Sequence, residues 1–203
     1  MAYNGQSGQD RFVLSVLNNK RNGTFLEIGT NHPININNSY ILEKTYGWTG
    51  LMVEYDHTYE KLYTQHRTSP YVIQDAQTVD YSGLFKTYNF PTAIDYLQID
   101  LEVNNGSTIN TLKRLEATVF PTHTFSVVTF EHDIYTGDHF DTRNTSRVIF
   151  ERNGYVRVFS DVKNQGNAYE DWYVHPANVD MDYVNSIKVG TPMEYTDIVK
   201  LLR

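Results

Sequence analysis

The sequence predicts an α/β fold in which helices cover both faces of a mostly parallel, seven-stranded sheet. Short apolar runs at 24–29 and 49–55 each carry an acidic residue near their carboxyl end, Glu27 in the first and Glu54 in the second. Amphipathic helical segments separate most successive runs, which is the alternation typical of parallel strands. The last two runs have no helix between them, so the sheet should end in an antiparallel hairpin.

The individual elements follow in chain order. A first helix is expected at about 7–17, because Ser7 can act as its N-cap and Asp10 stands at the capping-box position. Parallel strands are then expected at 24–29, 49–55, 71–75, 94–101 and 125–130, with helices at about 36–46, 57–66, 82–88, 107–116 and 146–152. The closing hairpin should pair 155–159 with 171–174. The polar segment 133–144 between strand and helix is interpreted either as a substrate lid or as an ordinary mobile loop.

Length and composition limit the functional classes. The 203 residues suffice for one α/β domain with a proper core, so residues 1–203 are interpreted as a single domain. With 24 acidic and 17 basic residues, a net charge of -7 and no run of Lys and Arg, a nucleic-acid partner is not expected. No apolar stretch approaches the ~20 residues of a membrane span, and the first residues do not follow a signal-peptide pattern, which predicts a cytoplasmic protein without a membrane partner. The absence of cysteine excludes disulfides, thiolate catalysis and Cys-based zinc sites.

The turn after the first strand indicates a nucleoside ligand. Gly29 allows the backbone to approach a ligand closely, and Glu54 can accept hydrogen bonds from both hydroxyls of a ribose. A dinucleotide site needs the pattern G-x-G-x-x-G, whereas residues 29–34 read GTNHPI and keep one of the three glycines. A nucleoside without phosphates, such as S-adenosylmethionine (SAM), therefore suits this turn better than NAD.

Acidic residues recur at the carboxyl ends of successive strands. Each of them alone could cap the following helix, but together they line one edge of the sheet and predict a site. These positions are Glu27, Glu54, Asp75, Asp100 with Glu102, and Glu131-His132-Asp133.

Several blocks carry a family resemblance that runs nearly from end to end. They are Ser7-Gly8-Gln9-Asp10, Leu26-Glu27-Ile28-Gly29, Val53-Glu54, Ile94-Asp95-Tyr96-Leu97-Gln98-Ile99-Asp100-Leu101-Glu102, Phe130-Glu131-His132, Asn153-Gly154-Tyr155 and Glu170-Asp171-Trp172-Tyr173-Val174-His175-Pro176. In these blocks the chain resembles the FkbM-type SAM-dependent O-methyltransferases, a group that largely methylates hydroxyls of sugars and natural products. The chain departs from the family signature where Gln98 replaces a lysine and Val103 replaces a glycine.

The resemblance implies a Rossmann-like class I methyltransferase sandwich that binds SAM. Carried over by position, Glu27 and Gly29 would contact the amino acid end of SAM, Glu54 the ribose, and Asp75 with Ala76 the adenine. The implied acceptor is a carbohydrate, a glycan or glycosylated molecule, with a deoxyhexose such as rhamnose as the first to try. The implied source is a large algal virus, which would place the protein in the host cytoplasm.

Methyl transfer to a hydroxyl needs alignment of the two reactants and removal of the hydroxyl proton. In one version Asp100 or His132 is the base, with Glu102 and Glu131 orienting the base or the sugar. In the other, Asp100, Glu131 and His132 bind Mn²⁺ or Mg²⁺, which acidifies the hydroxyl. The sequence leaves both versions open.

Two other functions compete with this interpretation. An NAD-dependent nucleotide-sugar oxidoreductase is weakened by the missing glycines of the first turn. A non-catalytic glycan-binding domain on a degenerate methyltransferase fold is favoured by the substitutions at Gln98 and Val103. The sequence gives no indication of the oligomeric state.

Overall fold

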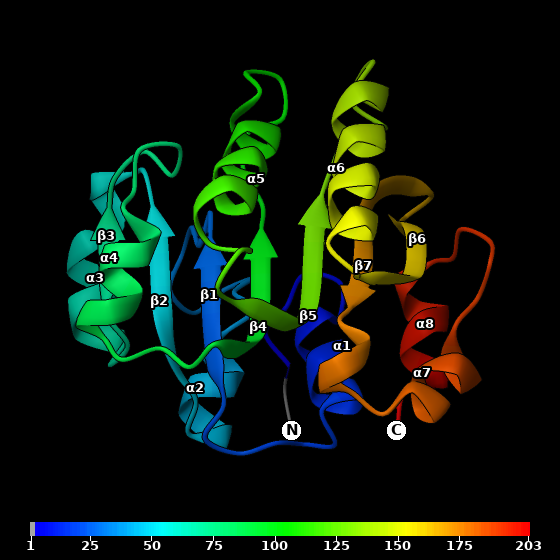
Figure 1. Ribbon diagram of the computed structural model, residues 1–203, viewed down its shortest axis with the longest axis horizontal. Helices are drawn as coiled ribbons and strands as arrows, with labels where there is room; N and C mark the ends of the chain where they lie inside the picture. The colour runs from blue at the N-terminus through cyan, green and yellow to red at the C-terminus, as the bar shows by residue number, and fades with distance from the viewer. Residues whose placement is uncertain (1–2) are drawn as a thin grey trace.

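A computed structural model describes residues 3–203. Its sheet has seven strands in the order β3-β2-β1-β4-β5-β7-β6 (Figure 1). The strands are β1 (Thr24–Ile28), β2 (Thr49–Glu54), β3 (Tyr71–Ile73), β4 (Ala93–Ile99), β5 (Thr124–Glu131), β6 (Val156–Asn164) and β7 (Asn167–Val174). Only β7 among them runs antiparallel to its neighbours, β5 and β6. The predicted α/β fold, a mostly parallel sheet that ends in an antiparallel hairpin, is thus confirmed.

Helices cover both faces of the sheet, as predicted. One face packs against α1 (Gln9–Val16), α2 (Tyr40–Tyr46), α3 (Glu60–His66), α7 (Met181–Ile187) and α8 (Tyr195–Leu201). The other face packs against α4 (Tyr81–Thr87), α5 (Ser107–Thr118) and α6 (Phe140–Arg152), of which α5 and α6 cross in front of the sheet in Figure 1. Two short 3-10 turns complete the chain, η1 (His57–Tyr59) and η2 (Pro176–Asn178).

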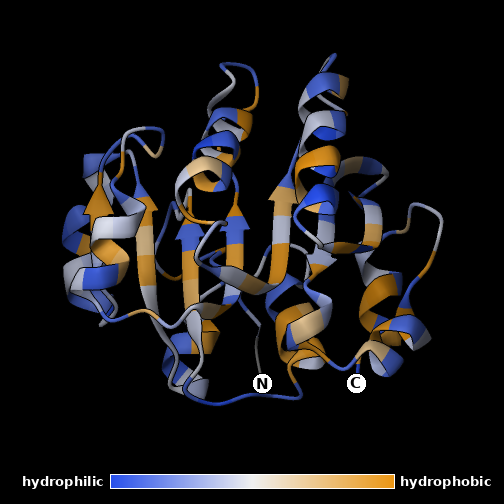
Figure 2. Cartoon of the chain, viewed as in Figure 1, coloured by the Kyte–Doolittle hydropathy of each residue, from blue (hydrophilic) through white to orange (hydrophobic). Residues whose placement is uncertain are grey.

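The two cores follow from the period of two in a strand. Successive side chains point to opposite faces, so Phe25 joins the core beneath α1 and α2 while Leu26 joins the core beneath α4 and α5. The middle of the sheet is mostly hydrophobic, and the helices carry both hydrophobic and hydrophilic residues (Figure 2). Among the described residues, no helix is long and apolar enough to cross a membrane.

The start of α1 differs from the capping-box prediction. The N-cap is Gly8, whose φ of 77° lies in the left-handed region, and the side chain of Ser7 does not cap the helix. The carboxylate of Asp10 instead accepts hydrogen bonds from the backbone nitrogens of Asn4 at 2.8 Å and Gly5 at 2.9 Å. Asp10 therefore fixes the segment that leads into the helix.

The other differences concern element length. Helix α6 begins at Phe140 and not near residue 146, so the polar loop that follows β5 ends at His139. Strands β6 and β7 are longer than expected and meet in a tight turn at Gln165 and Gly166, which both have positive φ. The longer hairpin brings its tip to the edge of the sheet where the parallel strands end.

Gly29 is required by a close approach between two chain segments. It has a φ of 80°, and a Cβ atom built on it would lie 1.6 Å from the carbonyl oxygen of Asp100. The turn after β1 therefore packs directly against the backbone that follows β4.

We expect Gly29→Ala to lower the free energy of unfolding by about 3 kcal/mol, because left-handed strain and a backbone clash combine. Gly166→Ala is the matched control, since Gly166 has a φ of 84° but a Cβ atom added to it would have no other atom within 4 Å. It should cost only about 1 kcal/mol. Urea unfolding of both variants measures the difference, and equal losses would contradict the clash.

Candidate functional site

A cavity of about 590 Å³ opens at the carboxyl ends of β1, β4 and β5. The β1 turn forms one side, the ends of β4 and β5 contribute acidic groups, and the tip of the β6–β7 hairpin lies on its wall. The lining residues are Gln6, Gly29, Thr30, Asn31, His32, Asn35, Ile36, Gln98, Asp100, Glu131, Asp133, Tyr135, Asn164, Gln165, Asn167 and Tyr169. Ligands of open α/β sheets bind at this edge.

Three acidic side chains in the cavity repel one another. Burial raises the pKa of Asp100 to about 7, and the charge of Asp133 adds to the effect, although a hydrogen bond with Glu131 opposes it. Burial and the neighbouring charges of Asp100 and Asp133 hold the pKa of Glu131 well above its ordinary value. Burial also raises the pKa of Asp133. Near neutral pH this cluster therefore holds protons that ordinary carboxylates would have released.

Gln98 is the buried polar residue beside this acidic cluster. Its Nε2 lies 3.4 Å from Oδ2 of Asp100, while its Oε1 is buried without a hydrogen-bond partner among the described residues. A buried acceptor without a partner is unfavourable, so a ligand that donates a hydrogen bond here would relieve that cost.

Glu170 stands behind the cavity, opposite Glu131 in the β5–β7 pairing. It is 1% exposed and accepts hydrogen bonds from Nε1 of Trp172 at 2.5 Å and Nε2 of Gln9 at 3.2 Å. Burial raises its pKa to about 8 even though these hydrogen bonds favour the charged form. The Gln9 of the sequence block 7–10 thus supports a buried acid beside the site.

His132 does not join Asp100 and Glu131, which corrects both its predicted roles as base and as metal ligand there. Because successive residues of a strand point to opposite faces, Glu131 faces the cavity and His132 turns beneath α6. Its Nε2 lies 3.6 Å from Oδ1 of Asp161 and 3.6 Å from Oδ1 of Asp171, and its side chain is fully buried.

The group of His132, Asp161 and Asp171 has its ligand atoms close enough to hold a metal ion. However, Arg147 donates to both oxygens of Asp171 at 2.6 and 2.9 Å, and Arg143 donates to Asp161 at 3.1 Å. Burial would raise the pKa of Asp171, but the nearby imidazole of His132 and the hydrogen bonds from Arg147 outweigh it and hold the pKa well below its usual range. The arginines already neutralise these carboxylates, so the group fits an ion-pair network better than a metal centre.

Glu102 is not among the residues that line the cavity, and its catalytic role stays a prediction. It is exposed, and its Oε1 accepts hydrogen bonds from the backbone nitrogen of Asn104 at 3.0 Å and from Nδ2 of the same residue at 2.7 Å. Glu102 therefore stabilises the turn that leads to α5.

Glu54 ends β2, as predicted, beside the β1 turn. Its Oε2 accepts from the backbone nitrogen of Asn31 at 2.6 Å, and its Oε1 accepts from those of Tyr55 and Asp56 at 2.9 Å. A carboxylate has about four acceptor positions, and the three hydrogen bonds leave about one for a ribose hydroxyl. Tyr55 is 74% exposed at this edge and offers a ring face to a ligand.

Asp75 and Ala76 follow β3 next to this edge. The Oδ1 of Asp75 accepts from the backbone nitrogen of Gln77 at 2.9 Å, and the carbonyl of Ala76 accepts from the hydroxyl of Tyr81 at 2.9 Å. Neither residue is among those that line the cavity. Their contact with adenine stays a prediction.

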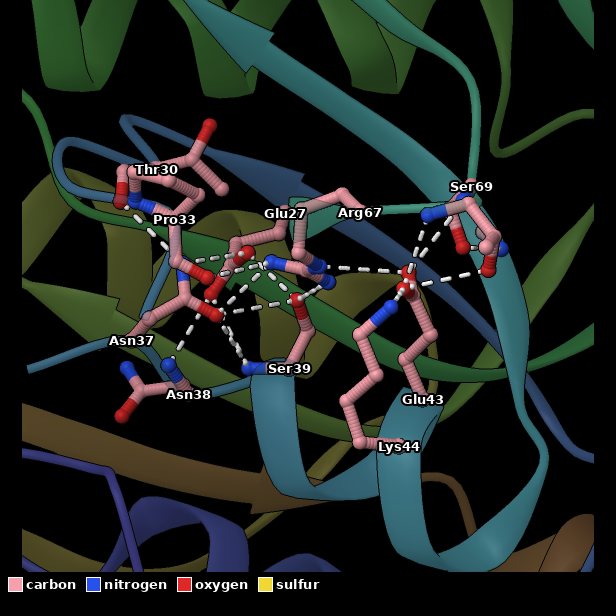
Figure 3. A network of polar contacts seen from close by, with 12 residues as sticks. Glu27, Thr30, Pro33, Asn37, Asn38, Ser39, Glu43, Lys44, Arg67 and Ser69 are labelled. Atoms are coloured by element: carbon pink, nitrogen blue, oxygen red, sulfur yellow. Dashed lines mark hydrogen bonds and ion pairs between the residues drawn. The ribbon is translucent and has the colours of Figure 1, made fainter. Parts of the chain in front are cut away.

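Glu27 is held away from the cavity by a dense network (Figure 3). Its Oε1 accepts from the backbone nitrogens of Asn38 and Ser39, both at 3.1 Å. Its Oε2 accepts from Oγ of Ser39 at 2.6 Å and from Nδ2 of Asn37 at 3.2 Å. Since the side chain is fully buried and each oxygen has two donors, Glu27 organises the loop 30–39 and is poorly placed to bind the amino acid end of SAM.

Arg67 completes the same network from the end of α3. It donates to the carbonyl of Pro33 at 3.2 Å, to Oγ of Ser39 at 2.8 Å and to Oε2 of Glu43 at 3.2 Å. Burial would raise the pKa of Glu43, but Arg67 and hydrogen bonds from the 68–69 segment lower it to about 2. The loop that follows Gly29 is therefore fixed by buried charges on both sides.

Comparison with solved structures finds proteins of similar architecture. An O-methyltransferase candidate from Klebsiella pneumoniae superposes with a TM-score of 0.55 at 11% identity, over 86% of this chain and 83% of that one. An rRNA-methylase candidate from Clostridium thermocellum superposes with a TM-score of 0.51 at 13% identity, over 85% of this chain and 97% of that one. A methyltransferase from Pyrococcus furiosus superposes with a TM-score of 0.51 at 16% identity, over 83% of this chain and 81% of that one. The chain has the Rossmann-like methyltransferase fold.

These likenesses concern the fold alone, because the identities are low. No protein-family model matches the sequence, and no curated protein matches it significantly.

We expect Glu27→Gln to lower the free energy of unfolding by about 3 kcal/mol, because an amide nitrogen would face donors that now bind an oxygen. Urea unfolding measures this, with the exposed Asp182→Asn on α7 as control. Binding of S-adenosylhomocysteine should weaken together with stability. Loss of binding at unchanged stability would instead show that Glu27 contacts the cofactor.

Stability should fall between pH 5 and pH 8, because Asp100 and Glu170 have pKa values of about 7 and about 8 in the folded state. The native state then binds more protons than the unfolded chain, so unfolding becomes easier as pH rises. Glu170→Gln should remove part of this slope, on the order of 2 kcal/mol over the range. Urea titrations at pH 5, 6.5 and 8 measure it, and an unchanged slope in the variant would refute the assignment.

Proposed function

We propose that the protein is a SAM-dependent O-methyltransferase that methylates a hydroxyl of a carbohydrate. The observation that carries the proposal is the cluster of Asp100, Glu131 and Asp133 in a cavity bordered by the Gly29 turn. A hydroxyl loses a proton when it is methylated, and an acidic group with a pKa near 7 is well matched to receive it.

The residues around the turn fit the cofactor. SAM supplies an electrophilic methyl group on a sulfonium. Gly29 lines the cavity, Glu54 keeps about one acceptor position for a ribose hydroxyl, and the exposed Tyr55 can cover an adenine ring. Gln98 offers its unpartnered Oε1 to a donor such as the ammonium of the methionine moiety. In this proposal Gly29 contacts the amino acid end of SAM, as predicted, and Gln98 replaces Glu27 in that contact.

Asp100 is the proposed base. Above about pH 7 it is a carboxylate that can accept the hydroxyl proton. Glu131, whose pKa is held well above its ordinary value by burial and by the charges of Asp100 and Asp133, orients the acceptor. In a metal-assisted version, Asp100 and Glu131 would hold Mg²⁺ or Mn²⁺, with Asp133 and Oε1 of Gln98 as oxygen donors in place of His132. The cation would then acidify the hydroxyl.

The carbohydrate acceptor rests on the resemblance and on the polar lining. Seven of the sixteen lining residues are Asn or Gln, which suits a ligand rich in hydroxyls. A glycan that carries a deoxyhexose such as rhamnose is the first acceptor to test, and a viral source remains a prediction of the resemblance.

The competing functions make different demands on the same cavity. A glycan-binding domain without catalysis would bind sugar but transfer no methyl group, and Gln98 in place of the family lysine favours it. An NAD-dependent oxidoreductase would need room and donors for a pyrophosphate at the Gly29 turn. Titrations of SAM and of NAD separate these alternatives.

We expect calorimetry to give micromolar SAM binding, about -8 kcal/mol, and no NAD binding. Asp100→Asn should retain SAM binding and lose about a hundredfold or more in kcat, measured as S-adenosylhomocysteine formed with methyl rhamnoside and oligosaccharide acceptors, with and without Mn²⁺. The wild-type rate should rise with pH through about 7, while Asp182→Asn should match wild type.

Failure of SAM to bind, or an active Asp100→Asn enzyme, would refute the proposal. Sugar binding without methyl transfer would favour the non-catalytic glycan-binding domain.

A further inference from the structure

We propose that the tip of the β6–β7 hairpin is the acceptor-recognition wall, and that it selects an uncharged, hydroxyl-rich acceptor over a phosphorylated one. This inference rests on the proposed function. Asn164, Gln165 and Asn167 line the cavity together with Gln6 from the segment before α1. Asn164, Gln165 and Asn167 belong to the β6–β7 hairpin, which follows β1 and β2 in sequence and lies apart from them in the sheet, so they need not serve the cofactor.

The chemistry of this wall matches hydroxyl groups. A carboxamide carries both a donor and an acceptor, and a sugar hydroxyl carries both as well. The side chains of Gln165 and Asn167 make no hydrogen bond with any residue in 3–203. These groups are therefore available to a ligand.

The charge of the cavity disfavours anions. Asp100, Glu131 and Asp133 line it, and across residues 3–203 neither lysine nor arginine does. A phosphate or diphosphate would lack the cationic partner that such groups normally find in proteins and would face the three acids. A nucleotide sugar is thus a poor ligand, whereas the same sugar in a neutral glycoside fits.

The wall is held in place before any ligand arrives. Nδ2 of Asn164 donates to Oγ of Ser7 at 3.1 Å, and the backbone nitrogen of Gly166 donates to Oε1 of Glu194 at 2.8 Å. The nitrogen of Lys163 also donates to the carbonyl of Met193 at 2.8 Å. A wall anchored at three points loses little conformational freedom when it binds a ligand.

The wall is also separate from the nucleoside end of the site. β6 lies at one edge of the sheet and β3 at the other, so Glu54 and Asp75 are several strands away from the hairpin tip. Substitutions at the tip should therefore change acceptor binding without changing cofactor binding.

The experiment uses the full chain saturated with S-adenosylhomocysteine and follows binding by NMR titration. The probes are methyl α-L-rhamnopyranoside and methyl β-D-xylopyranoside as neutral glycosides, and UDP-glucose as a nucleotide sugar. At least one neutral glycoside should bind at least tenfold more tightly than UDP-glucose. The double variant Gln165→Ala/Asn167→Ala should weaken its binding about tenfold, as expected for two lost hydrogen bonds.

Controls separate recognition from folding and from the cofactor. Asn185→Ala removes an exposed carboxamide on α7 and should bind the glycoside like wild type. The double variant should keep its melting temperature and bind S-adenosylhomocysteine within twofold of wild type. Tighter binding of UDP-glucose, no glycoside binding, or an unaffected double variant would overturn the inference. If the wild-type protein does not bind S-adenosylhomocysteine, the proposed function is refuted instead. Glycoside titrations of the unliganded protein would then still decide the role of the wall.

Discussion

The buried guanidinium of Arg67 organises the segment on which the candidate site depends. It bonds to Pro33, Ser39 and Glu43, while Glu27 binds the same loop from β1 (Figure 3). Losing one partner of such a buried network costs about 3–5 kcal/mol, because the remaining charge stays desolvated. The loop lacks the glycines of a dinucleotide turn, and this network fixes its path.

The sheet sorts its acidic residues into two environments. Beneath α6, Asp161 and Asp171 are paired with Arg143 and Arg147, so their charges are balanced within the chain. On the cavity side, Asp100 and Glu131 have raised pKa values because burial and the charges of neighbouring carboxylates are not balanced by a cation within residues 3–203. Uncompensated buried acids lower stability, and proteins keep them mainly where function needs them. The contrast points to the cavity as the working side.

The sequence predicts the sheet well because β/α alternation and strand-end acids are local signals. Asp100 and Glu131 come together as expected, since both end parallel strands at one edge. His132 does not join them, contrary to the prediction from the sequence, because consecutive residues along a strand point to opposite faces of the sheet. The sequence does not reveal that Glu27 is bound by Asn37 to Ser39, because these partners come from a loop whose path no local pattern indicates. Asp133 lies two residues beyond the end of β5 and has a φ of 46°, so strand alternation does not place it. The tip at Gln165 enters the cavity only because β6 and β7 are longer than their apolar runs suggest.

The contact between Gly29 and Asp100 links the two halves of the proposed reaction. The carbonyl of Asp100 occupies the space that a side chain at position 29 would need, so the cofactor turn and the proposed base share one backbone contact. A shift of the turn must therefore move the base as well. Methyl transfer depends on alignment within a fraction of an ångström, and a rigid contact between the two binding elements provides it without any moving part. Position 29 therefore requires glycine for the alignment of the proposed reactants as well as for folding.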